Sequence, residues 1–138
     1  MGLDVQLLRE SFSLVVEREP ELTRRFYEVL FQKHPESRAL FSRRSELEQQ
    51  KMLRDMLVSV IEHLEDADWL GARLGALGEK HVGYGVTPEM YGWVGGSLLE
   101  TLREVAADDW SPGMEAAWSD AYSAIAGLMR AGAQSASK

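Results

Sequence analysis

Apolar residues recur every three or four positions along most of this chain, and no segment alternates apolar and polar residues as a strand does. The spacing therefore predicts an all-α fold of about seven helical segments with short connections. The segments are Val5–Val16, Leu22–Leu30, His34–Phe41, Leu53–Leu64, Leu70–His81, Pro88–Val105 and Ser111–Met129. Between Phe41 and Leu53, the polar stretch Ser42–Glu46 is expected to be a loop or a weak helix.

The size and charge of the chain limit what it can do. Its 138 residues suit a single domain over 1–138, in which the small, polar residues 131–138 are expected to fray. A formal net charge of −7, with no Lys/Arg cluster, argues against nucleic acid and membrane surfaces as partners. Zero cysteines exclude disulfides, thiolate metal ligands and cysteine nucleophiles. The start of the chain has no targeting pattern and no apolar run is long enough to span a membrane, so a cytoplasmic location is expected.

His81 is the residue most suggestive of chemistry. Leu70, Leu74, Leu77 and His81 fall on one helical face, so an imidazole ends an apolar stripe. Glycines and a Thr-Pro-Glu helix start follow within residues 83–89, which predicts a corner beside the imidazole. Such a position suits a ligand to a metal ion or a haem iron. On spacing alone, a core histidine whose ring nitrogens are satisfied by nearby groups is the preferred alternative.

Several separated motifs resemble one family. They are Phe26-Tyr27, then Phe31, Pro35 and Phe41; Lys80-His81; Pro88-Glu89-Met90-Tyr91; and Val94–Leu102. Together, in this order, they resemble the globin domain of flavohaemoglobins and of their single-domain bacterial relatives, from about residue 5 to residue 130. The resemblance implies a globin fold, a three-over-three helical sandwich around a haem. The implied cofactor is haem b (iron protoporphyrin IX), held without covalent attachment because no cysteine is present.

The resemblance also implies roles for individual residues. His81 becomes the proximal iron ligand, and Phe41 lies against the haem plane. The haem is further lined by apolar residues that would otherwise be ordinary core residues, namely Leu53, Leu77, Val86 and Val94. Each of these side chains therefore has a structural interpretation beside the functional one.

On the distal side, Tyr27 matches the family's tyrosine, whose hydroxyl can donate a hydrogen bond to a bound gas. Its alternative is a core tyrosine bonded to the backbone. Gln49 is preferred over Gln50 as the distal glutamine, because Gln49 puts Leu53 one turn further along the helix over the haem. His34 and His63 are expected at the surface, so a second histidine ligand to the iron is not expected.

One departure from the family concerns the group behind His81. Tyr91 matches the tyrosine that flavohaemoglobins place there, but their glutamate falls at about Ala133, and no acid follows Asp120. Because such carboxylates tune ligand basicity, the proximal side is expected to behave like that of an ordinary oxygen-binding globin. The chain also contains no Gly-rich dinucleotide fingerprint of the kind a flavin and nicotinamide domain would bring.

The resulting functional hypothesis is reversible binding of O2, NO and CO, in oxygen storage or transport. Nitric oxide dioxygenation is an alternative that would need a separate reductase to return the iron to its reduced state. A gas sensor is a second alternative, and a helical interaction domain without a cofactor is the third.

Overall fold

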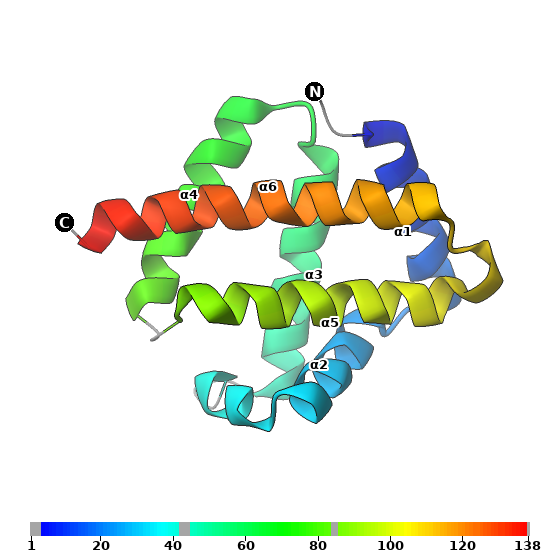
Figure 1. Ribbon diagram of the computed structural model, residues 1–138, viewed down its shortest axis with the longest axis horizontal. Helices are drawn as coiled ribbons and strands as arrows, with labels where there is room; N and C mark the ends of the chain where they lie inside the picture. Colours follow the sequence, from blue (N-terminus) through cyan, green and yellow to red (C-terminus); the bar gives the residue numbers. More distant parts are fainter. Residues whose placement is uncertain (1–3, 42–44, 84–85, 138) are drawn as a thin grey trace.

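The computed structural model describes residues 4–41, 45–83 and 86–137 (Figure 1). Within these ranges it is helical and contains no strand, which confirms the all-α prediction. The elements are α1 (Val5–Arg18), α2 (Leu22–Lys33), η1 (Pro35–Phe41), α3 (Glu46–Glu62), α4 (Ala67–Gly83), α5 (Pro88–Ala106), η2 (Ala107–Asp109) and α6 (Pro112–Ser137), where η marks a 3-10 helix. Of the predicted loops, Ser42–Arg44 and the Tyr84-Gly85 part of the corner after His81 lie outside the described residues.

The long helices form crossed layers. α5 and α6 run side by side and are joined through η2, and α3 crosses behind them (Figure 1). α6 lies against α4, α2 packs on α5, and α1 contacts both α5 and α6 at one end of the molecule. Among the described residues, no helix combines the length and the apolar character that a membrane span requires.

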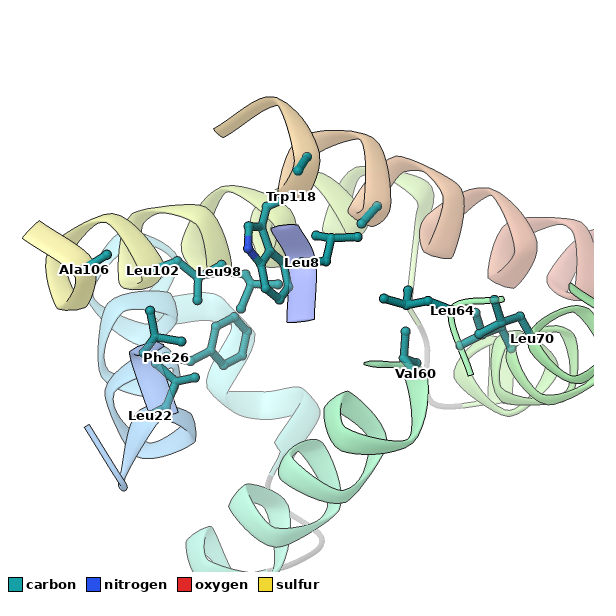
Figure 2. Close-up of a cluster of buried hydrophobic side chains, with 14 of the residues drawn as sticks. Leu8, Leu22, Phe26, Val60, Leu64, Leu70, Leu98, Leu102, Ala106 and Trp118 are labelled. Atoms are coloured by element: carbon teal, nitrogen blue, oxygen red, sulfur yellow. The ribbon is translucent and has the colours of Figure 1, made fainter. Parts of the chain in front are cut away.

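A core of interlocking side chains joins these layers. Leu8, Phe26, Leu98, Leu102 and Trp118 come from four different helices and meet in one cluster (Figure 2). All five are buried, so each removes apolar surface from water, at about 25 cal/mol per Å² of area. Trp118 keeps its polar atom satisfied inside the core, because its indole Nε1–H donates to the Ser11 hydroxyl at 2.8 Å.

Local sequence sets the helix starts. Asp4 caps α1 by accepting from the Leu7 amide at 3.2 Å, and Ser45 caps α3 by accepting from the Glu48 amide at the same distance. Ser111 does likewise for α6, accepting from the Met114 amide at 3.1 Å. At α5, Pro88 follows the N-cap Thr87, as the sequence predicted.

α6 is assigned as helix to Ser137, and the expected fraying of residues 131–138 stays a prediction. Small residues permit close packing near this end of the helix. A Cβ added to Gly132 would fall 2.7 Å from the Gly75 Cα, so the backbones of α6 and α4 meet directly at this point.

Candidate functional site

Two cavities have Phe41 in their lining. The larger, of about 280 Å³, is lined by Arg24, Tyr27, Glu28, Phe31, Arg38, Phe41, Glu46, Gln49 and Gln50. The smaller, of about 130 Å³, is lined by Leu30, Ser37, Leu40, Phe41, His81, Val86, Met90, Tyr91, Trp93, Val94, Tyr122 and Met129. Tyr27 and Gln49, assigned to the distal side, thus line one cavity, and His81, assigned to the proximal side, lines the other.

His81 is held near the end of α4, facing the smaller cavity. Its Nδ1 lies 2.8 Å from the Leu77 carbonyl oxygen, and the Val86 amide donates to the His81 carbonyl at 3.1 Å across the corner. Burial lowers the pKa of His81, although the bond to Leu77 opposes that shift, so the neutral ring is favoured. If Nδ1 carries the hydrogen, as a bond to a carbonyl requires, Nε2 bears the lone pair that a metal ligand needs.

Tyr27 projects into the larger cavity from α2 within a group of aromatic rings. It stacks on Phe31 at 5.7 Å between ring centroids and meets Phe26 and Phe41 edge-on at 5.1 and 5.3 Å. Burial raises the pKa of Tyr27 to about 12, so the phenol stays protonated at neutral pH. Its hydroxyl lies 3.5 Å from the Gln49 carbonyl oxygen, at the outer limit of a hydrogen bond. The ring is therefore fixed, while the hydroxyl is held only weakly.

The remaining predicted residues divide into two groups. Gln49 and Gln50 both line the larger cavity, so the preference for Gln49 stays a prediction. Val86 and Val94 line the smaller cavity with His81. Leu53 and Leu77 are half-buried against the hydrophobic core and line neither of these two cavities.

The proximal side contains Tyr91, which the sequence analysis placed behind His81, and Tyr122, to which it assigned no role. Tyr91 lines the smaller cavity, and its carbonyl accepts a 2.6 Å hydrogen bond from the hydroxyl of Tyr122. The Tyr122 ring lies on Gly95, where an added Cβ would fall 2.5 Å from the ring. Burial raises the pKa of Tyr91, and the positive charge of Arg130 opposes this shift. A signal for Tyr122 was available, because it lies one turn after Trp118 on the inward face of α6.

The other two histidines are more covered than expected. Both were predicted at the surface, but both are half-buried, because each ring stacks on a tryptophan. His34 lies 4.8 Å from Trp93 and His63 lies 3.8 Å from Trp69, between ring centroids. Neither histidine lines either of the two cavities described here.

Comparison with known proteins shows to which family this chain belongs. The globin family model matches residues 24–129. This chain belongs to the globin family. It is 32% identical over 126 residues to a flavohemoprotein of Rhodopirellula baltica, an alignment that covers 90% of this chain but only 31% of that protein. It is also 32% identical to an uncharacterized globin-like protein of Aquifex aeolicus, over 88% of this chain and 86% of that one.

Solved structures show the same architecture for this globin. A bacterial globin from Campylobacter jejuni superposes with a TM-score of 0.80 at 22% identity, covering 95% of this chain and 94% of the other. The myoglobin of Aplysia limacina superposes with a TM-score of 0.77 at 21% identity, covering 94% and 95%. The predicted resemblance and the globin fold are thus confirmed. Membership of the family implies haem binding, and a half-buried neutral imidazole beside largely apolar walls fits that group.

Proposed function

We propose that this globin binds one haem b without covalent attachment and uses it to bind O2, NO and CO reversibly. The observation that carries the proposal is the placement of His81, a half-buried histidine whose Nδ1 is engaged by Leu77 and which shares a cavity with Phe41. His81 would hold the iron, and bound haem supplies the iron atom at which diatomic gases bind.

The proximal residues orient and cover the imidazole. The Leu77 carbonyl accepts from Nδ1 at 2.8 Å, which fixes the tautomer and the direction of the ring. Phe41, Val86, Tyr91 and Val94 supply the surrounding wall, and their largely apolar surfaces exclude water. Leu53 and Leu77 are proposed to complete the haem contacts from the core side.

The distal residues select among gases by hydrogen bonding. Tyr27 stays protonated and its ring is fixed by Phe26, Phe31 and Phe41, so its hydroxyl is a ready donor within the larger cavity. Gln49 would add a side-chain amide donor in the same cavity. Donors of this kind favour a polar ligand such as oxygen over carbon monoxide, which is a weaker acceptor.

Absorption spectra of the purified protein in oxidised, reduced and CO-treated forms test the proposal when compared with those of two histidine variants. His81→Ala should lose most of its haem. His63→Ala is the matched control, because His63 makes the same bond to a carbonyl one turn earlier, at 2.7 Å to Ser59, but lines neither cavity. His63→Ala should keep its haem. A colourless wild-type protein that cannot take up added haem would refute the proposal.

Nitric oxide dioxygenation is a second candidate, favoured by the similarity to flavohemoproteins. The chain spans 31% of the length of the first of these. Because the iron must be reduced again after each reaction, we propose that a reductase supplies the electrons. Nitrate production from several equivalents of nitric oxide, with NADH and with or without an added flavoprotein reductase, tests this candidate. Nitrate should be limited to about one equivalent per protein unless the reductase is present.

A further inference from the structure

One arginine in the lining of the larger cavity has no charged partner among the described residues. Arg38 lies in η1, and its guanidinium carbon is 4.8 Å from the centre of the Phe31 ring. A cation at this distance is attracted by the negative face of the ring, so the contact holds the side chain at the cavity wall. Within residues 4–41, 45–83 and 86–137, the guanidinium makes no ion pair or hydrogen bond. Its N–H donors are therefore available to a ligand.

The other charged side chains at this cavity are of two kinds. Arg24 is engaged by acids, because its Nη2 lies 2.6 Å from a carboxylate oxygen of Glu21 and its Nε lies 3.9 Å from one of Glu28. Glu46 also lines the cavity, and in the described part of the chain it makes no ion pair. Arg38 therefore supplies the positive charge that is left for an anion, and the carboxylate of Glu46 opposes it.

The cavity around Arg38 also offers neutral hydrogen-bond donors. The Tyr27 phenol stays protonated and is held only weakly, at 3.5 Å from the Gln49 carbonyl oxygen. The side-chain amides of Gln49 and Gln50 belong to the same lining. A guanidinium presents its N–H groups in a planar fork, which matches two oxygens of a planar anion. The volume of about 280 Å³ leaves room for a small ion with water molecules around it.

We propose that Arg38 forms a binding site for a small planar oxyanion in the larger cavity. Two sources supply this chemistry, namely a dissolved anion such as nitrate and the carboxylates of the haem itself. Nitrate is also the product of the nitric oxide dioxygenation considered above. Only this link to the product rests on the proposed function, because the contacts that define the site involve Arg38, Phe31 and their neighbours alone.

Titration of the isotope-labelled protein with sodium nitrate, followed by NMR, tests the proposal. The haem-loaded protein is kept as its CO complex, so that nitrate does not compete for the iron, and the ionic strength is held constant. The side-chain Nε–H resonance of Arg38 should shift and then saturate as nitrate is added. The side-chain amide resonances of Gln49 and Gln50, which line the same cavity, follow binding in every variant.

Matched variants separate a specific site from the general effect of surface charge. Arg38→Ala should weaken nitrate binding about 10-fold or more, because hydrogen bonds to a charged ligand are lost. Arg38→Lys should restore only part of this loss, since an ammonium keeps the charge without the planar fork. Arg24→Ala removes the same charge from the same lining, but its partner is Glu21, so the affinity should change less than about twofold. Glu46→Gln should strengthen binding about 2- to 5-fold.

Protein loaded with the dimethyl ester of haem, which has no free carboxylate, identifies the source of the anion. Equal nitrate binding with haem and with the ester supports a site for dissolved anions, whereas binding only with the ester supports a site that a haem carboxylate fills. The proposal is overturned if nitrate moves the Arg38 resonance in neither form, or if Arg24→Ala weakens binding as much as Arg38→Ala. A protein that takes up no haem overturns the proposed function instead, and nitrate binding at Arg38 can still be titrated in it.

Discussion

Two helices of equal length face the proposed haem site, yet they are held very differently. α3 and α4 each have 17 residues. α3 buries only Val60, and its first turn carries Leu47 at 78% exposure. α4 buries Leu70, Leu74 and Gly78 and lies directly on α6.

The difference indicates that the two sides of the site are organised by different means. On the proximal side, α4, which carries His81, packs closely against α6. On the distal side, the aromatic cluster around Tyr27 in α2 is fixed, whereas α3 brings Gln49 to the cavity with little packing behind it. Substitutions should therefore act mainly on stability in α4 and mainly on ligand binding at the distal side.

The largest expected effect is on the free energy of unfolding, and it is tested with one leucine from each of the two helices. Leu74→Ala removes a side chain that is 1% exposed and should lower the free energy of unfolding by about 2–5 kcal/mol. Leu53→Ala removes a half-buried side chain from α3 and should cost about 1 kcal/mol. Urea unfolding of the haem-free proteins measures both. Equal losses would mean that α3 is packed as firmly as α4.

The next comparison concerns two half-buried tyrosines. Tyr27→Phe removes a donor to the bound gas, worth about 1.5–3 kcal/mol, so oxygen should dissociate roughly 10- to 150-fold faster. Tyr122→Phe should barely alter that rate, but it should lower stability by about 1 kcal/mol because the Tyr91 carbonyl loses its 2.6 Å bond.

Stopped-flow measurement of oxygen dissociation and urea unfolding, run on both tyrosine variants, check that one variant changes the rate and the other the stability. Carbon monoxide dissociation serves as the control, since it should change much less in Tyr27→Phe. If the dissociation rates of oxygen and carbon monoxide increase by the same factor, the substitution has opened the cavity instead of removing a hydrogen bond.

The smallest expected effect is on oxygen dissociation, and it concerns two neighbouring glutamines that both line the larger cavity. Gln49→Leu should speed oxygen dissociation by about 2- to 12-fold, which corresponds to one neutral hydrogen bond of about 0.5–1.5 kcal/mol. Gln50→Leu should leave the rate within twofold. The reverse order would assign the distal donor to Gln50.

The fold was predictable because it depends on apolar spacing, which a sequence displays directly. Helix starts were predictable from capping residues such as Ser111 and from prolines such as Pro88. The close approach of Gly132 to Gly75 was not predictable, because it joins residues far apart in sequence.

The candidate site was predictable only in part, because contacts between distant residues also decide which side chains reach it. Val86 and Val94 were expected near His81, and the structure brings them into its cavity. Leu53 and Leu77 share helical faces with site residues but line neither cavity, because spacing fixes a face and not a depth. The stacking of His34 on Trp93 likewise required the tertiary arrangement of α2 and α5.

Replacing His81 with glycine and then adding free imidazole tests the central claim most directly. The glycine variant should hold haem weakly, and added imidazole should restore haem retention and the reduced and CO-treated spectra of the wild type, because the ring then enters the space that the side chain left. A His81→Gly variant that shows wild-type haem content and spectra without imidazole would contradict the assignment of His81 as the iron ligand.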